Sequence, residues 1–173
     1  AIPSGLCDRI LMEYQDCSDW YESSISSGDI IKDKRSCKCV DMSMQDIIEN
    51  NFEVRKSLDD ELHHYVQNVL KKYLECFGNF KIQMDMGYGL LKYDVGDFYI
   101  QHTDSFAEEQ RTLTCSIALN DDYEGGEFAL FDREIVHKLK KGSVIMFPSN
   151  FMYPHEIMKV TKGSRYSVIT WFV

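Results

Sequence analysis

The chain has 173 residues, of which 44% are hydrophobic and 27% charged, as in an ordinary globular protein rather than a disordered or fibrous one. We expect residues 1–173 to form a single domain, because this length suits one hydrophobic core and is too short for two full domains. The formal net charge of −9 argues against nucleic acid as a partner, because gripping a phosphate backbone needs a basic surface.

The sequence contains no run of about 18 apolar residues, so we predict no membrane helix and no membrane partner. Its first residues lack the basic and apolar regions of a signal peptide, which predicts a cytoplasmic protein. The six cysteines are scattered along a chain that is not small, a pattern that favours reduced thiols over a disulfide framework.

Residues 1–80 are expected to supply helical support and a loop. The segment PSGLCDRILMEYQD carries apolar residues at helical spacing and predicts a short first helix. From Ser18 to Met44 the sequence is polar and poorly periodic, which predicts a long loop, either a lid over a site or a solvated connection. From Leu58 to Phe77 apolar residues recur on one stripe, which predicts a helix that supports a sheet and ends at Gly78.

Residues 81–173 are expected to form the β core, because the periodicity changes from helical to alternating after Gly78. Seven short runs separated by turn signals predict seven or eight strands: GLLKYDV, DFYIQHTD, TLTCSIALN, GEFALFD, SVIMFP, EIMKVT and RYSVITWFV. Their short, regular spacing favours an antiparallel sandwich or jelly roll over parallel crossovers. A jelly roll encloses a pocket between its two sheets.

His102 and Asp104 lie two residues apart at the end of one predicted strand. Side chains two apart on an extended strand point to the same face, so an imidazole and a carboxylate would project together as half of a metal site. The candidate third ligand is His155, at the beginning of a later strand, although a single histidine there is also compatible with a structural role. His137 lies among charged residues and is expected to be exposed.

Arg165 lies in a strand otherwise made of Val, Ile, Tyr and Trp, ten residues beyond His155. An arginine in such a strand needs an anionic partner, because burying an unpaired charge is costly. Ser167 would share its face, and a guanidinium beside a hydroxyl is suited to bind a carboxylate through two hydrogen bonds. An acidic side chain of the protein itself is the alternative partner.

Together these motifs resemble the Fe(II)- and 2-oxoglutarate-dependent oxygenases, most closely the prolyl 4-hydroxylase-like branch. The resemblance covers roughly Met86 to Val173 and rests on four ordered motifs: YDVGDFYIQHTD, RTLTCSIALNDDYEGGEF, KKGSVIMFPS and PHEIMKVTKGSRYSVITWF. It implies a mainly β protein with a double-stranded β-helix, or jelly roll, supported by N-terminal helices.

The resemblance also implies a set of site residues. The Fe(II) ligands would be two histidines and one aspartate, His102, Asp104 and His155. Such a set suits ferrous iron and leaves positions open for 2-oxoglutarate and dioxygen. Arg165 would bind the distal carboxylate of 2-oxoglutarate, with Ser167 and Tyr93 as further contacts. No catalytic residue beyond the metal ligands is expected, and ascorbate would keep the iron reduced.

The function implied by the resemblance is hydroxylation of a protein or peptide residue, most of all proline, with conversion of 2-oxoglutarate to succinate. The alternatives are a hydroxylase of a free amino acid or other small molecule, and a non-catalytic module that binds metal and a partner. Arg165 separates enzyme from module, because a structural metal has no use for a carboxylate clamp. Loops around the pocket, Ser18 to Met44 and Ser105 to Gln110, are expected to select the substrate.

Overall fold

The computed structural model describes residues 1–25, 28–43, 52–78, 80–107 and 110–173. Helix α1 spans Ser4–Tyr14 and helix α2 spans Phe52–Phe77. Both helices predicted from the sequence are present, but α2 begins before the predicted Leu58. Its first residues are mostly exposed, so they carry no apolar stripe that would have revealed the helix.

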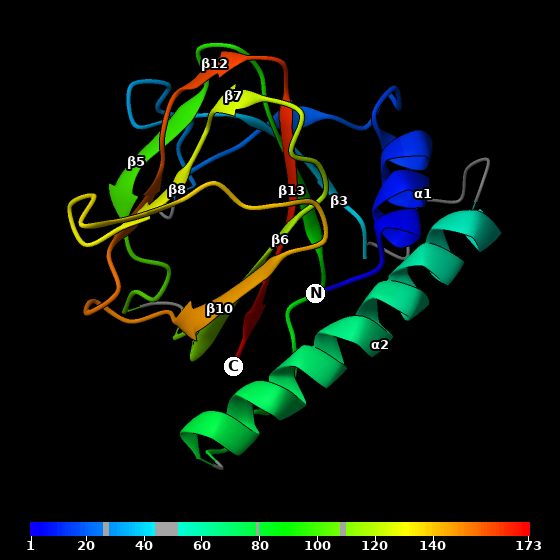
Figure 1. The fold of residues 1–173 in the computed structure, drawn as a ribbon, viewed down its shortest axis with the longest axis vertical. Coiled ribbons are helices and arrows are strands. Elements are labelled where there is room, and N and C mark those ends of the chain that lie inside the picture. The colour runs from blue at the N-terminus through cyan, green and yellow to red at the C-terminus, as the bar shows by residue number, and fades with distance from the viewer. Residues whose placement is uncertain (26–27, 44–51, 79, 108–109) are drawn as a thin grey trace.

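The strands are short, and most lie in the second half of the chain (Figure 1). Their bounds are β1 Tyr21–Glu22, β2 Arg35–Ser36, β3 Lys38–Asp41, β4 Gly89–Tyr93, β5 Phe98–His102, β6 Leu113–Ala118, β7 Glu124–Gly125, β8 Phe128–Leu130, β9 Ile135–His137, β10 Val144–Pro148, β11 His155–Ile157, β12 Val160–Lys162 and β13 Arg165–Phe172.

Two antiparallel sheets and one small strand pair make up the β core. The six-stranded sheet has the order β1-β3-β4-β13-β6-β10, the five-stranded sheet has the order β2-β5-β11-β8-β9, and β12 pairs with β7. Apolar side chains of both large sheets pack against one another in a shared core. The predicted jelly roll is therefore confirmed.

The prediction of a loop from Ser18 to Met44 is wrong, because this segment contains β1, β2 and β3. Strand β3 pairs with β4, and β2 pairs with β5, so the segment contributes to both large sheets. Such short polar strands show no visible alternation, and their pairing is imposed by neighbours distant in sequence. Residues 26–27 and 44 of the segment lie outside the described residues.

The strand count was also underestimated in the second half of the chain. The two short strands β7 and β9 were not predicted, and the run EIMKVT divides into β11 and β12. A strand of two or three residues is too short to show a period of two in the sequence. His137, at the end of β9, is exposed as expected.

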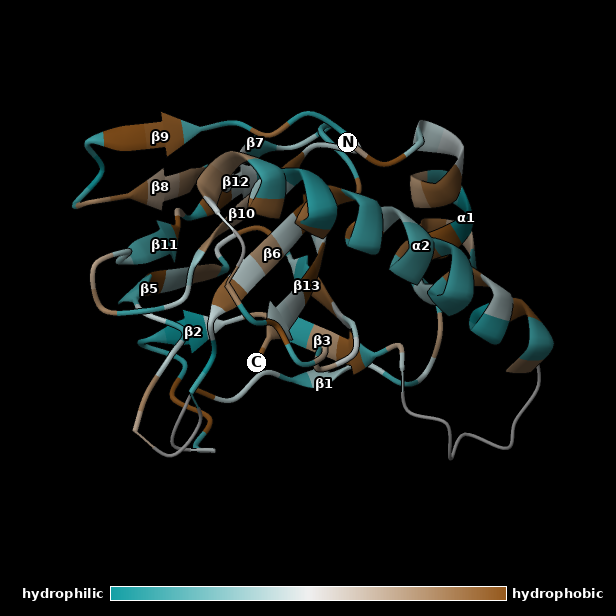
Figure 2. Cartoon of the chain, turned by 90° about the horizontal axis from the view of Figure 1, so that it is seen from below, coloured by the Kyte–Doolittle hydropathy of each residue, from teal (hydrophilic) through white to brown (hydrophobic). Residues whose placement is uncertain are grey.

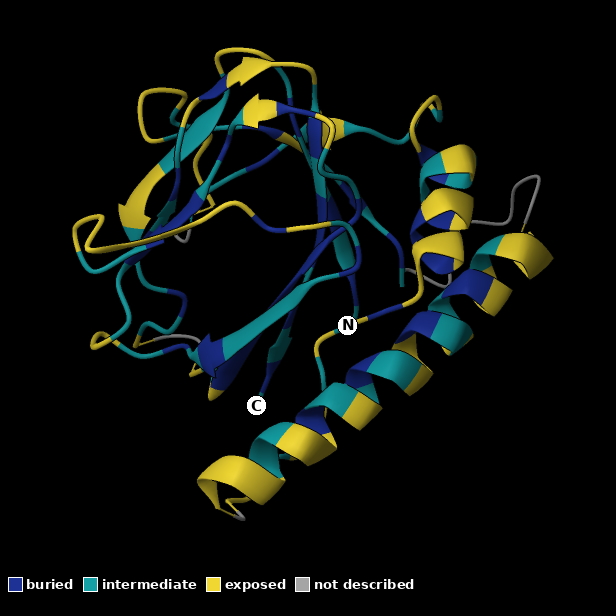
Figure 3. Ribbon diagram, viewed as in Figure 1, coloured by how far each residue is buried: buried dark blue, intermediate teal, exposed yellow. Residues whose placement is uncertain are grey.

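Apolar side chains form two layers, one on each side of the six-stranded sheet. The outer layer joins both helices to this sheet through Leu6, Ile10, Leu58, Leu62, Val66, Leu90, Ile117 and Val168. The inner layer lies between the two sheets and includes Tyr93, Ala118, Phe128, Phe147 and Ile157. The buried stripe of α2 faces the sheet, and its exposed residues face away (Figure 3).

Successive side chains of strand β13 point alternately to the outer layer and to the inner side of the sheet. Three side chains facing the helices belong to the outer layer, namely Tyr166, Val168 and Phe172. The alternate side chains line a pocket between the sheets, namely Arg165, Ser167, Ile169 and Trp171. In the hydropathy colouring, apolar and more polar residues alternate along β6, which pairs with β13 (Figure 2).

None of the six cysteines forms a disulfide in the structure. Among the described residues, neither helix combines the length and the apolar character that crossing a bilayer requires.

The attachment of α2 to the sheet can be tested at Leu62, which is fully buried. We expect Leu62→Ala to lower the free energy of unfolding by about 2–5 kcal/mol, because it removes buried apolar contacts and leaves a cavity. The matched control is Val54→Ala on the same helix, where the side chain is 49% exposed, and its effect should stay within about 0.5 kcal/mol. Urea titration of both variants measures the difference, and equal effects would contradict the packing described.

Candidate active site

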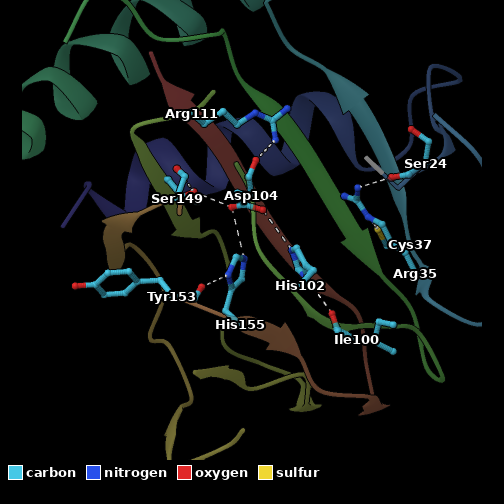
Figure 4. Close-up of polar contacts among 11 residues, drawn as sticks. Ser24, Arg35, Cys37, Ile100, His102, Asp104, Arg111, Ser149, Tyr153 and His155 are labelled. Atoms are coloured by element: carbon cyan, nitrogen blue, oxygen red, sulfur yellow. Dashed lines mark hydrogen bonds and ion pairs between the residues drawn. The ribbon is translucent and has the colours of Figure 1, made fainter. Parts of the chain in front are cut away.

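Three potential metal ligands meet between β5 and β11 (Figure 4). His102 ends β5, and the antiparallel register places it opposite His155, the first residue of β11. Nε2 of His102 lies 3.4 Å from Oδ1 of Asp104, and Nε2 of His155 lies 3.5 Å from Oδ2. One ligand atom from each residue lies within 4.8 Å of the other two, so the three side chains could hold one ion.

The other ring nitrogen of each histidine contacts a backbone carbonyl. Nδ1 of His102 lies 2.8 Å from the oxygen of Ile100, and Nδ1 of His155 lies 3.2 Å from the oxygen of Tyr153. A carbonyl oxygen can only accept, so Nδ1 carries the proton in both rings. The lone pairs on Nε2 therefore point toward Asp104, which is the tautomer that metal binding needs.

Asp104 is buried and held by the Thr114 hydroxyl of β6 and by the backbone of Ser149, the residue that follows β10. Thr114 Oγ1 donates to Oδ2 of Asp104 at 2.7 Å, and Ser149 Oγ lies 2.8 Å from the same hydroxyl. The backbone N–H of Asp104 donates to the Ser149 carbonyl at 3.2 Å. These contacts fix both the position and the rotation of the carboxylate.

The protonation states also suit a metal site. Burial acts to raise the pKa of Asp104, but the neighbouring His102, His155 and Thr114 outweigh it and hold that pKa below its usual value. Burial lowers the pKa of His155 to about 4, and the opposing effect of Asp104 is smaller. At neutral pH the carboxylate is ionised and the imidazole of His155 is neutral, as metal ligands must be.

The three residues predicted to bind a carboxylate lie in the same pocket, whose volume is about 320 Å³. Arg165 is only 2% exposed, and its Nη1 donates to Ser167 Oγ at 2.8 Å. Its guanidinium carbon lies 5.3 Å from the centre of the Tyr93 ring. Among the described residues no carboxylate forms an ion pair with Arg165, so the alternative of an internal acidic partner finds no support there.

Gly126 makes room for the aliphatic part of the Arg165 side chain. A Cβ on Gly126 would lie 3.1 Å from Cδ of Arg165 and 3.0 Å from Cγ2 of Val160. Gly126 also has φ = +63°, which disfavours any residue with a side chain. Gly126 therefore allows both the positive φ of the turn and the close approach of the Arg165 side chain.

Several residues in or beside the pocket were missed or left undecided from the sequence. Thr114 and Ser149 contact Asp104 from positions distant in the chain, so no local sequence spacing predicts their role. Tyr99 and Trp171 are ordinary strand aromatics by sequence, yet both line the pocket. Arg111 donates to the Asp104 carbonyl at 3.2 Å, and its guanidinium carbon lies 3.7 Å from the centre of the Trp171 ring.

Both segments predicted to select the substrate contribute to the pocket. Ser24, Ile25, Gly28 and Arg35 come from the first, and Phe106 comes from the second. Residues 108–109 of the second segment lie outside the described residues. The arrangement as a whole is a jelly roll with two imidazoles and one carboxylate in its pocket, which is the ligand set of non-haem Fe(II) oxygenases.

Comparison with known proteins agrees with this class. Residues 88–173 match the 2OG-Fe(II) oxygenase superfamily. A PKHD-type hydroxylase of Alteromonas mediterranea is 31% identical over 99 residues, which cover 56% of this chain and 41% of that protein. Human prolyl 3-hydroxylase 2 is 40% identical over 67 residues, which cover 36% of this chain and 10% of that protein.

Solved structures share the fold. A prolyl hydroxylase from Trichoplax adhaerens, in complex with a hypoxia inducible factor oxygen degradation domain peptide fragment, superposes with a TM-score of 0.79 at 20% identity. The match covers 98% of this chain and 77% of that one.

Through residues 88–173 the chain belongs to the 2OG-Fe(II) oxygenase superfamily, and it is prolyl hydroxylase-like. The resemblance inferred from the sequence motifs is thus confirmed. The family implies Fe(II), 2-oxoglutarate and O2, and the donor set of His102, Asp104 and His155 fits a ferrous ion. The chain spans less than half the length of the curated relatives it matches.

The support of Asp104 by Thr114 can be tested by metal binding. We expect Thr114→Val to weaken Mn(II) binding about 10- to 100-fold, because the carboxylate loses the hydroxyl that orients it. Thr161→Val, the same change at an exposed residue of β12, is the matched control and should bind like the unchanged protein. Isothermal titration calorimetry on the metal-free protein gives the affinities, and equal values for both variants would contradict the role of Thr114.

Proposed function

We propose that the protein is an Fe(II)- and 2-oxoglutarate-dependent hydroxylase that acts on a prolyl residue of a protein or peptide. In this proposal the Fe(II) ligands are His102, Asp104 and His155. The residues that bind 2-oxoglutarate are Arg165, Ser167 and Tyr93.

The observation that carries the proposal is Arg165. A buried guanidinium without an acidic partner among the described residues would be unfavourable in the empty pocket, because an unpaired charge loses its hydration. A dicarboxylate that reaches the metal ligands with one end and Arg165 with the other would relieve this cost. A module with a purely structural metal would have no such requirement.

When bound, Fe(II) with 2-oxoglutarate and O2 supplies the oxidation that inserts oxygen into a C–H bond and yields succinate and carbon dioxide. The protein's own residues prepare the site. His102 and His155 present Nε2 lone pairs because their Nδ1–H groups are engaged by carbonyls, and Asp104 stays ionised. Arg165 and Ser167 orient the distal carboxylate, and the aromatic walls of the pocket restrict water.

Proline as the target is supported by the relatives. The similarity extends to a prolyl 3-hydroxylase in sequence and to a peptide-bound prolyl hydroxylase in fold. Ser24, Ile25 and Gly28 line the pocket together with Phe106, so a peptide at its mouth could contact these residues.

The proposal is tested by supplying Fe(II), 2-oxoglutarate and ascorbate together with a library of proline-containing peptides. We expect a mass gain of one oxygen on a prolyl residue and formation of an equal amount of succinate, both measured by mass spectrometry. The control peptides carry alanine in place of proline and should gain no oxygen. Turnover with free amino acids but with no peptide would replace the proposal by a small-molecule hydroxylase.

The co-substrate role of Arg165 has its own test. We expect Arg165→Ala to weaken 2-oxoglutarate binding to the Mn(II)-loaded protein about ten- to a hundredfold, because two charge-assisted hydrogen bonds are lost. Arg165→Lys should recover part of the affinity, since it keeps the charge but not the planar fork. Arg9→Ala, at an exposed arginine of α1, is the control. Unchanged 2-oxoglutarate affinity in Arg165→Ala, with Mn(II) still bound, would rule out the clamp.

A further inference from the structure

Arg35 is one of three arginines that line the pocket, with Arg111 and Arg165, and neither the metal site nor the proposed co-substrate site uses it. It lies on β2, opposite Tyr99 of β5 in the antiparallel register. Its guanidinium carbon is 4.7 Å from the centre of the Tyr99 ring, and that ring stacks on His102 with a centroid distance of 3.5 Å. One aromatic ring thus separates the positive charge of Arg35 from a metal ligand.

The contacts of Arg35 leave part of its hydrogen-bonding capacity open. Nε donates to Sγ of Cys37 at 3.2 Å, and Nη1 donates to the Ser24 carbonyl at 2.7 Å (Figure 4). A guanidinium carries five N–H groups, so these bonds fix its plane without exhausting its donors. Within the described parts of the chain Nη2 has no hydrogen-bond partner and Arg35 has no ion pair.

The charge balance of the filled pocket points to an anion at this position. The two charges of Fe(II) and the one of Arg165 are offset by the two carboxylates of 2-oxoglutarate and by Asp104. Asp104 is the one carboxylate among the described lining residues. Arg111, the third lining arginine, contacts the Asp104 carbonyl and the Trp171 ring. Arg35 adds a positive charge beyond this balance, and no further carboxylate among the described lining residues compensates it.

We infer that Arg35 is a specificity residue that binds a carboxylate side chain of the peptide substrate, close to the hydroxylated residue. The inference rests on the proposed function, because it concerns the peptide that the hydroxylase accepts. Residues two apart in an extended peptide are separated by about 7 Å and point to the same side. A glutamate or aspartate within two residues of the target can therefore reach Arg35 while the target lies at the metal site.

The test uses pairs of proline peptides that differ only in glutamate or glutamine at each of the two positions on either side of the proline. Binding is measured by calorimetry to the protein loaded with Mn(II) and 2-oxoglutarate, which does not turn over. At one of these positions we expect the glutamate peptide to bind about tenfold more tightly, because a charge-assisted bidentate contact replaces a neutral one. In Arg35→Gln this ratio should fall to about one, and Arg35→Lys should keep part of it.

Lys34→Gln is the matched control, because it removes the same charge from the exposed neighbouring residue, and its ratio should equal that of the unchanged protein. Mn(II) titration of each variant verifies that the metal site is intact. A ratio near one in the unchanged protein, or a tenfold ratio that persists in Arg35→Gln, would overturn the inference. Equal hydroxylation of both peptides would overturn it while leaving the proposed function in place, whereas no binding and no hydroxylation of any peptide would remove both.

Discussion

The antiparallel pairing of β5 with β11 is the constraint on which the site depends. It sets His102 opposite His155, so two imidazoles that are 53 residues apart in the chain share one face. A slip of one residue would turn His155 to the other side of the sheet and leave His102 and Asp104 as half a site. Hydrogen bonds from the backbone thus determine the geometry of the chemistry, and the side-chain contacts of Asp104 refine it.

The second constraint is the alternation along β13, which gives one strand two different tasks. Its outward residues attach the sheet to the helices, and its inward residues place Arg165 and Ser167 in the pocket. Because the helices fix the strand from behind, the guanidinium can stay buried without an acidic partner in the described pocket. The hydrophobic layer under α2 and the proposed anion site on the far face therefore depend on the same eight-residue strand.

The sequence was sufficient for those features that local patterns encode. Spacing of two predicted that His102 and Asp104 act together, alternation predicted the long strands, and the apolar stripe after Leu58 predicted most of α2. The roles of His155 and Arg165 could be inferred only from the order of the motifs along the chain, which resembles that of a known family. Strands β1 to β3, Thr114 and Arg35 escaped notice, because their roles arise from contacts with residues distant along the chain. The assignment of residues 1–173 to a single domain, and the roles of the site residues, stay predictions.

The two sheets differ in their support. Both helices lie against the six-stranded sheet, whereas no described helix covers the outer side of the five-stranded sheet (Figure 1). His102 and His155 belong to the five-stranded sheet, which no described helix covers, and Arg165 belongs to the six-stranded sheet, which the helices cover. An ion that binds only the native state stabilises that state by mass action. A metal held by His102 and His155 would therefore cross-link β5 and β11 in the five-stranded sheet, which has no helix against its outer side among the described residues. Loss of the ion would then loosen the five-stranded sheet before the six-stranded sheet.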